Sequence, residues 1–411
     1  MFACMGRTFF LIFALLGAAV SGAVAEELTE AEALRRFSEE SPRARAVRSR
    51  VPVVRAETRA WNLLPNPTVA GLRESVNHSS DEFFTVAQRI PLSGRRGLLR
   101  RAGDAAVDAA REQSEHLLFQ LRADLRLAFY SLLAAQEQRD VLHNGLGELQ
   151  EVVRILQERE RQGEGSTFDR LRAERELANT VTARMQADGR VAQAQAQLAS
   201  FFRLGAEPDS LTARGPLAHQ GQLPPLDELL EQTFHNRSDY RAEQRRLERL
   251  QLERRAAERL RIPEPLVSAG TKIFRSPGFS DVGYTLGVSV PLPIFNRGQV
   301  EVARLRASTQ RTESLLQGLR VEMEAGTKAV YAAVQFRRRM AEQHTSQLGP
   351  RTQQLADIAQ LAYQEGEMGI LELLDAYRVG LLARLRSVEL LEAVRIAEIE
   401  LDRAAGQEVI P

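Results

Sequence analysis

The sequence has few of the residues on which catalytic and metal sites usually depend. Cys4 is the only cysteine among 411 residues, and it lies within a predicted signal peptide, so we expect a mature chain without a thiol. Disulfide bonds, thiolate metal sites and cysteine catalysis are thereby excluded. The six histidines are scattered, with no two of them three or four residues apart, so no histidine metal site is predicted. No glycine-rich phosphate motif is recognisable, and no cofactor is expected.

Long apolar runs are also missing. After the N-terminal stretch, no segment offers roughly 18 uninterrupted apolar residues, the length that a transmembrane helix needs. The N-terminus combines Arg7, the apolar stretch Phe9–Val20 and the small residues Ala23 and Ala25, which predicts a signal peptide over residues 1–25. Cys4 precedes the apolar stretch and therefore cannot be the acylated cysteine of a lipoprotein. An exported chain of this kind is periplasmic, secreted, or inserted in an outer membrane as strands.

Neither sign of charge is in excess. The 55 basic and 54 acidic residues give a formal net charge of +1, and no segment combines clustered basic residues with aromatics, so a nucleic-acid partner is not expected. Short basic runs such as Arg337–Arg339 fit solvated helix faces. The residues that the chain does contain in quantity are Ala, Leu, Glu, Arg and Gln, a composition typical of long packed helices.

Two halves of the chain repeat the same order of landmarks, offset by about 200 residues. The matched pairs are Leu64–Gly71 with Ile262–Gly270, Val86–Gly97 with Val288–Gln299, Tyr130 with Tyr331, and Glu160–Glu174 with Tyr363–Tyr377. We therefore divide the chain into a first structural repeat over 26–203, a linker rich in proline and glycine over 204–225, a second repeat over 226–406 and a tail over 407–411.

Each repeat is predicted to follow one plan. Apolar periodicity and breaker residues indicate a helix, a β-hairpin, a very long helix, a glycine-bearing turn and a return helix. The helices are expected over Leu28–Trp61 (interrupted near Pro42), Gly97–Arg161 and Phe168–Phe202, and over Leu226–Arg261, Gly298–Gln364 and Ile370–Ala405. Breaks in the two long helices are expected near Gly145 and Gly147 and at Gly349-Pro350.

The predicted hairpins carry the strongest functional signal. Residues 67–77 and 82–91 pair in the first hairpin, and residues 265–274 and 282–291 in the second. One face of the second hairpin is apolar, with Tyr284, Leu286 and Val288, whereas the opposite face is small and polar. Such alternation is typical of lipid-facing barrels and equally of an ordinary sheet packed on a helix. Because four strands cannot close a barrel, a membrane location implies a ring of several chains.

The strands give way to helices through segments that contain proline and glycine. Six residues mark these transitions: Pro91, Gly94, Pro291, Pro293, Asn296 and Gly298. Proline donates no backbone hydrogen bond and therefore ends the strand ladder. The helices that follow have narrow apolar seams between polar positions. This pattern fits either the wall of a hollow helical tube or a solvated coiled-coil bundle.

At three of these motifs the chain resembles the TolC-type outer membrane efflux proteins. The motifs are Ser289–Gln299 (SVPLPIFNRGQ), Ile90–Gly97 (IPLSGRRG), and Tyr363 and Gly366 followed by Leu371–Ala376 (LELLDA). The resemblance covers Leu28 to Gly406, and the first motif is most similar to heavy-metal efflux components of the CzcC and CusC type. It implies a mainly α fold with a membrane β-barrel portion. Four strands from each protomer would join a twelve-stranded barrel shared by a homotrimer, beside a periplasmic barrel of helices.

The resemblance also implies a function and partners. The protein would be the passive outer membrane channel of a tripartite efflux pump, without enzymatic activity, and would export heavy-metal cations or drugs. Its partners would be a periplasmic adaptor, an inner-membrane pump of the RND type and outer membrane lipid. The alternative is a soluble periplasmic coiled-coil protein with adaptor-like sheets, which the signal peptide fits equally well.

Two groups of residues are assigned through the resemblance. The helical turns are expected to be the periplasmic tips that meet the adaptor, and they contain Gly163, Gly165, Tyr363, Gly366, Met368 and Gly369. Glu372 and Asp375 match an acidic ring that narrows the periplasmic entrance in well-known members. The first repeat departs from this pattern, because Asp169 answers Glu372 but Arg172 answers Asp375. Met368 also stands where some members have a latching arginine, and an Arg172–Asp375 pair between helices is an alternative to that latch.

Overall fold

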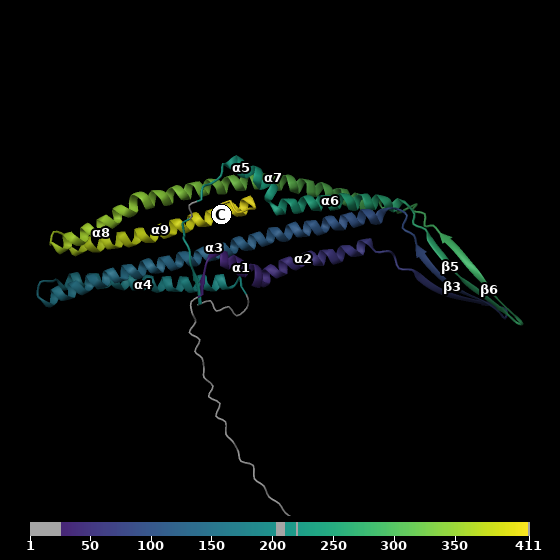
Figure 1. Ribbon diagram of the computed structural model, residues 1–411, viewed down its shortest axis with the longest axis horizontal. Helices are drawn as coiled ribbons and strands as arrows, with labels where there is room; N and C mark the ends of the chain where they lie inside the picture. Colours follow the sequence, from purple (N-terminus) through teal and green to yellow (C-terminus); the bar gives the residue numbers. More distant parts are fainter. Residues whose placement is uncertain (1–25, 203–209, 219–220, 410–411) are drawn as a thin grey trace, which may run out of the picture.

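The protein is an elongated layer of helices with a small β-sheet at one end and two helical turns at the other (Figure 1). The computed structural model describes residues 26–202, 210–218 and 221–409. The predicted signal peptide over residues 1–25 lies outside the described residues, as do parts of the predicted linker and the last two residues of the tail.

The first repeat follows the predicted order of elements. Its members are α1 (Glu30–Glu40), α2 (Pro42–Arg59), the 3-10 turn η1 (Ala60–Asn62), β2 (Thr68–Val76), β3 (Ser79–Arg89), α3 (Arg95–Arg161) and α4 (Thr167–Ala199). The predicted interruption near Pro42 is confirmed. Ser41 ends α1 and caps α2 through its hydroxyl, and Pro42 occupies the first helical position, where its missing N–H costs nothing.

The second repeat has the same plan with one additional break, in its long helix. Its members are α5 (Leu226–Asn236), α6 (Ser238–Glu258), the 3-10 turn η3 (Arg259–Arg261), β5 (Leu266–Ser276), β6 (Phe279–Ser289), α7 (Gln299–Gln343), the π-helical segment η4 (His344–Leu348), α8 (Gly349–Gln364) and α9 (Ile370–Ala405). The single helix predicted over Leu226–Arg261 is wrong. Arg237 adopts extended backbone between α5 and α6, and its guanidinium binds Asp239 in the first turn of α6.

The two long helices differ in continuity. The break predicted near Gly145 and Gly147 is wrong, because α3 runs unbroken for 67 residues. Gly145 instead allows close contact with α9, since a Cβ added there would lie 2.9 Å from Cδ1 of Leu381. The break predicted at Gly349-Pro350 is confirmed, and it takes the form of the π-helical segment that ends at Leu348.

Helix α3 runs through the middle of the layer. In the half next to the sheet, α3 packs between α2 and α6, and α7 packs on the far side of α6. In the other half, α3 packs between α4 and α9, and α8 packs on the far side of α9. The largest core cluster lies where the halves meet, around Leu125, Phe129 and Leu132 of α3. The interval predicted as a linker contributes the strand β4 (Leu211–Ala213), which pairs in parallel with β1 (Glu26–Leu28) beside this core.

The helices do not carry a membrane-spanning signal. Among the residues that the structure describes, none of the helices combines the length and the hydrophobicity needed to cross a bilayer.

Candidate channel surfaces

The sheet consists of the two predicted hairpins, joined side by side in the order β2-β3-β5-β6. All three pairings are antiparallel. The hairpin turns are shorter than predicted, because each strand extends further toward the tip. Asn77 and His78 alone make the first turn with positive φ angles of 47° and 69°, and Pro277-Gly278 makes the second.

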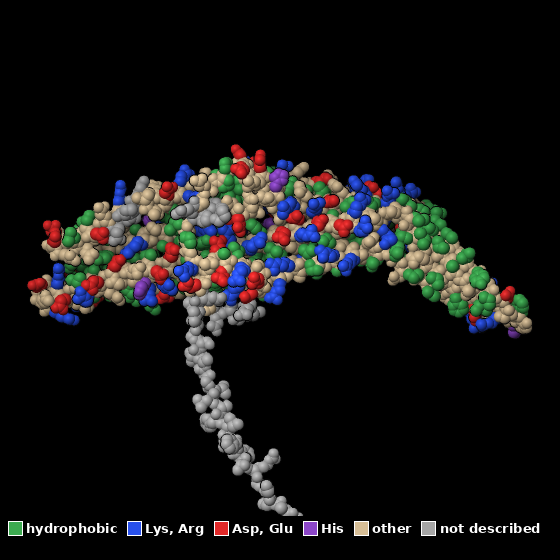
Figure 2. Space-filling model, viewed as in Figure 1, with side chains coloured by type: hydrophobic (Ala, Val, Ile, Leu, Met, Phe, Trp, Pro, Cys, Tyr) green, Lys and Arg blue, Asp and Glu red, His purple; other side chains and the backbone are tan. Residues whose placement is uncertain are grey.

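The two faces of the sheet have opposite chemistry, as the alternation predicts. Cross-strand pairing places Val69, Val86, Ala269 and Leu286 in one row, and Phe84, Thr271 and Tyr284 in the next row on the same face. Tyr284 and Leu286 are each 88% exposed. The other face carries small or polar residues such as Thr85, Ser268 and Gly287. Figure 2 shows hydrophobic side chains gathered over the sheet, whereas charged side chains cover the helices.

The predicted transition residues lie where the sheet meets the helices. Both long helices begin after a glycine in left-handed conformation, Gly94 with φ 69° and Gly298 with φ 82°. A polar side chain supports each turn. The hydroxyl of Ser93 accepts a hydrogen bond from the Arg95 N–H, and the Asn296 side chain accepts one from the Gly298 N–H. Pro91, Pro291 and Pro293 follow the ends of β3 and β6, as their missing donors require.

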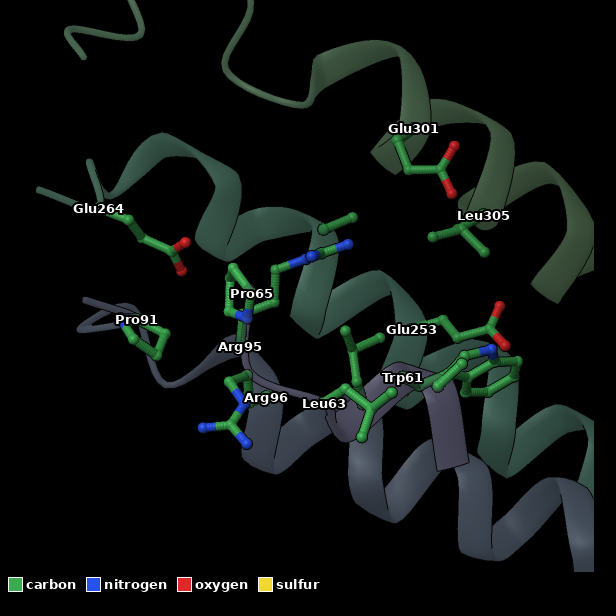
Figure 3. A pocket seen from close by; sticks show the side chains of 13 residues that line it. Trp61, Leu63, Pro65, Pro91, Arg95, Arg96, Glu253, Glu264, Glu301 and Leu305 are labelled. Atoms are coloured by element: carbon green, nitrogen blue, oxygen red, sulfur yellow. The ribbon is translucent and has the colours of Figure 1, made fainter. Parts of the chain in front are cut away.

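A cavity of about 470 Å³ lies in this junction between the start of α3 and the helices α6 and α7 (Figure 3). Arg95 and Arg96 come from α3, Glu253 comes from α6, and Glu301 comes from α7. Burial raises the pKa of Glu253 above its usual range. Trp61, the only tryptophan, closes one side. This cavity was not predicted, because its lining comes from four separate segments.

The helical turns at the opposite end are built on glycine. Gly163 and Gly366 have φ angles of 78° and 79°, which favour glycine. Gly165 is also needed, because a Cβ there would lie 2.7 Å from the backbone nitrogen of Glu160. Met368 packs against the apolar cluster at this end, and Gly369 caps α9.

The two turns contact each other within one chain. The guanidinium of Arg159, at the end of α3, lies 5.4 Å from the ring centre of Tyr363, at the end of α8. Burial raises the pKa of Tyr363. In the first turn, Arg170 binds both Glu160 and Glu174. The contact of Arg159 with Tyr363 was not predicted, because the two residues are 204 positions apart (363 minus 159).

The acidic residues assigned to the entrance lie at this end of the molecule. Glu372 and Asp375 are exposed on one face of α9, while Leu373, Leu374 and Ala376 pack inward. Asp375 binds Arg378 at 2.5 Å. Arg172 lies over the ring of Phe168, 5.9 Å from its centre, and Asp169 is half-buried. Within one chain Asp375 has a cation one helical turn away, and an Arg172–Asp375 pair stays a prediction.

A buried polar network ties the two repeats together at mid-length. The carboxylate of Glu30 on α1 accepts hydrogen bonds from Arg126 and Tyr130 of α3, and from Arg395 of α9 at 3.2 Å. Arg126 also binds Asp402 of α9 at 2.6 Å.

The network continues to α7, since Arg395 and Arg338 both bind Glu398, which is buried. Arg338 also donates to the carbonyl of Gly221, which joins the segment between the repeats to the same network. The sequence did not reveal the network, because its members are dispersed over more than 370 residues (402 minus 30).

The network shifts the protonation of its members. Burial acts to raise the pKa of Glu30, but the hydrogen bond from Tyr130 and the charges of Arg126 and Arg395 outweigh it, so this pKa lies below its usual value. Burial and the hydrogen bond to Glu30 raise the pKa of Tyr130 to about 12. Burial raises the pKa of Asp402 despite its bond to Arg126. Among the described residues, no group of His, Cys, Asp and Glu side chains could hold a metal ion.

Comparison with known proteins places these surfaces in context. The family model described as "Outer membrane efflux protein" matches residues 66–202 and 229–407, one segment in each half of the chain. The chain is 25% identical over 351 residues to the cobalt-zinc-cadmium resistance protein CzcC of Cupriavidus metallidurans, covering 84% of this chain and 82% of that protein.

Solved channels share the fold. A crystal structure of CusC matches with a TM-score of 0.76 at 16% identity and covers 92% of each chain. The open-state MtrE outer membrane channel of Neisseria gonorrhoeae matches with a TM-score of 0.74 at 18% identity, covering 92% of this chain and 89% of that one. The chain therefore belongs to the outer membrane efflux protein family and is an efflux channel of the TolC type rather than an enzyme.

Proposed function

We propose that three copies of this chain form one tube through which heavy-metal cations leave the periplasm passively, driven by an inner-membrane pump. The observation that carries the proposal is the sheet, whose exposed apolar face is bounded by edge strands β2 and β6. An open sheet edge cannot lie in lipid, because its backbone groups would have no hydrogen-bond partner. Pairing of β2 in one copy with β6 in the next removes both edges and closes a barrel of twelve strands.

The free flank of α7 supports the same ring. Its buried residues Leu305, Met323 and Val334 form the seam toward α6 and α9. At about 100° per residue, the exposed residues Val321, Ala332 and Phe336 lie on the opposite side of the helix. Val321 and Phe336 are 69% and 58% exposed in the single chain. A second copy that presents its α2 edge would cover this apolar stripe.

Heavy-metal cargo is supported by the relationship to CzcC, whose name specifies cobalt, zinc and cadmium resistance. In this chain, Glu372 and Asp375 would form a ring of carboxylates at the periplasmic entrance, which repels anions and favours cations. Selection of one metal over another would take place in the pump or the adaptor. The adaptor would meet the turns around Gly163, Gly165, Gly366 and Met368.

Extraction of the outer membrane fraction in detergent, followed by sizing, tests the tube. We expect a trimer that requires detergent, and recovery of a water-soluble monomer from the periplasm would refute it. The cargo is tested by deleting the gene and measuring growth on cobalt, zinc, cadmium and a panel of antibiotics. Sensitivity to the metals alone is expected, whereas sensitivity only to antibiotics would contradict a metal cargo.

A further inference from the structure

The apolar face of the sheet ends, toward the hairpin turns, in a charged cluster formed by Arg73, Glu82 and Arg275. Glu82 lies directly opposite Arg73 in the β2–β3 ladder. Its carboxylate is 3.6 Å from Nη1 of Arg73 and 3.0 Å from Nη1 of Arg275. The Glu82 side chain is only 15% exposed, whereas both arginine side chains are exposed. One carboxylate therefore lies between two guanidinium groups, and the cluster retains one excess positive charge.

The charged cluster lies on the same face of the sheet as the apolar rows, nearer to the hairpin turns. The row that contains Arg73 and Glu82 follows the row of Phe84 and Tyr284 on the same face, and Arg275 lies one row further. Rows on one face are about 7 Å apart, so the guanidinium groups lie just beyond the apolar band. At a similar height on the opposite face, Lys272 binds Asp81 at 3.1 Å, and that pair has no excess charge.

The geometry points to a binding site for a phosphorylated glycolipid of the outer leaflet, with its phosphate on Arg73 and Arg275 and its acyl chains along the apolar rows. The inference rests on the proposed function, because only a sheet that faces lipid offers this cluster to a lipid headgroup. Guanidinium groups match phosphate oxygens in a bidentate manner. Because Glu82 hydrogen-bonds Arg275 and lies 3.6 Å from Arg73, the two guanidinium groups are already close together before phosphate binds.

Native mass spectrometry of the purified trimer tests the site. Diphosphorylated lipid A and the same lipid without its phosphates are added at equal concentration, and the retained lipid is counted. We expect about tenfold more of the phosphorylated lipid on the wild type, since charge-assisted hydrogen bonds to phosphate are strong. The double variant Arg73→Gln with Arg275→Gln should lose this preference. Arg245→Gln with Arg246→Gln, two exposed arginines on α6, should keep it.

Equal retention of the two lipids by the wild type would overturn the inference, and so would an unchanged preference in the Arg73 and Arg275 variant. Displacement of the lipid by inorganic phosphate at equal concentration would also overturn it, because that result denies a contribution from the acyl chains. Failure of the proposed function gives a different result: the wild type would not be recovered as a detergent-requiring trimer at all. A trimer without a phosphate preference would refute only the lipid site.

Discussion

The long helices of the two repeats, α3 and α7–α8, occupy the same place in the order of elements. They differ in how many helices pack against them. Helix α3 has neighbours on both sides along its whole length, and buried residues occur from Ala102 to Leu156. Helix α7 lies at the border of the layer, where it packs on α6 and α9 with α5 against part of its length, and few of its residues are buried. The same order of elements therefore gives an inner helix, α3, that holds the protomer together. It also gives a marginal helix, α7, which lies at the border of the layer and is available to a second copy.

Removing a charge from the inner helix should have the largest effect. Arg126→Ala leaves the buried Asp402 and the partly buried Glu30 without their main cation, and breaking a buried ion pair costs about 3–5 kcal/mol. We expect a large fall in the thermal midpoint of the purified protein. Arg154→Ala, which removes an exposed pair with Glu151 on the same helix, should leave the thermal midpoint nearly unchanged. Equal losses in both variants would contradict the distinction.

A charge on the marginal helix should act on assembly instead. Val321→Arg places an unpaired cation in the proposed contact between copies, at a cost of several kcal/mol if it is buried there. The trimer fraction measured by sizing should fall at least about tenfold, while the far-UV helix signal is retained. Gly326→Arg, which places the same charge about 140° further around the helix, with nothing within 4 Å of the new Cβ, is the matched control. A normal trimer from Val321→Arg would exclude the apolar stripe of α7 from the interface.

The starts of the two helices offer a smaller contrast. Gly94→Ala and Gly298→Ala both force alanine into a left-handed conformation, which costs about 1 kcal/mol. At Gly298 the new Cβ would also lie 2.8 Å from the carbonyl oxygen of Ala257, whereas nothing lies within 4 Å at Gly94. Chemical denaturation should therefore show a loss at Gly298 about 1 kcal/mol greater. Equal losses of stability in the two variants would mean that α6 and α7 move apart at little energetic cost to accommodate the new Cβ.

The network around the inner helix should also respond to alkaline pH. Because the folded pKa of Tyr130 is raised to about 12 from an ordinary value of 10.0, its contribution to stability is present below pH 10 and disappears as pH rises toward 12. The wild type should lose about 1–2 kcal/mol more than Tyr130→Phe over this interval. Thermal midpoints of the two proteins at pH 9, 10, 11 and 12 make the comparison. Parallel curves would show that Tyr130 does not titrate abnormally.

The two tips provide the most modest test. Glu372→Ala with Asp375→Ala shortens the side chains of the proposed entrance ring and should raise single-channel conductance by about twofold in planar bilayers. Asp169→Ala in the first repeat, next to Arg172, should have less effect. Unchanged or lower conductance in the double variant would remove Glu372 and Asp375 from the entrance.

The sequence was most informative where structure depends on local periodicity. Alternation fixed the two faces of the hairpins, and Pro91, Pro291, Gly94 and Gly298 marked the ends of strands and the starts of helices. The continuity of α3 through Gly145 was missed, because packing against Leu381 outweighs the weak helix propensity of glycine. The extension of the strands to two-residue turns was missed as well, because polar residues near a turn are compatible with either strand or loop.

Contacts between distant segments were beyond the reach of local patterns. Glu30, Arg126 and Arg395 are charged helix residues of a kind that is usually exposed. Only the packing of α1, α3 and α9 brings them together. The same holds for Arg159 and Tyr363 at the tips. The internal repeat predicted the order of elements in the two halves correctly. It did not predict which of the long helices would lie inside the layer.

The two-residue hairpin turns limit how much of the protein is accessible from outside the cell. In the proposed trimer, Asn77-His78 and Pro277-Gly278 of each copy are the whole of the loop sequence beyond the strands. A phage, an antibody or a protease would therefore have almost no projecting loop to bind or cleave. Insertion of an epitope at either turn should therefore make intact cells bind an antibody against that epitope, and it should leave the helical end of the molecule undisturbed.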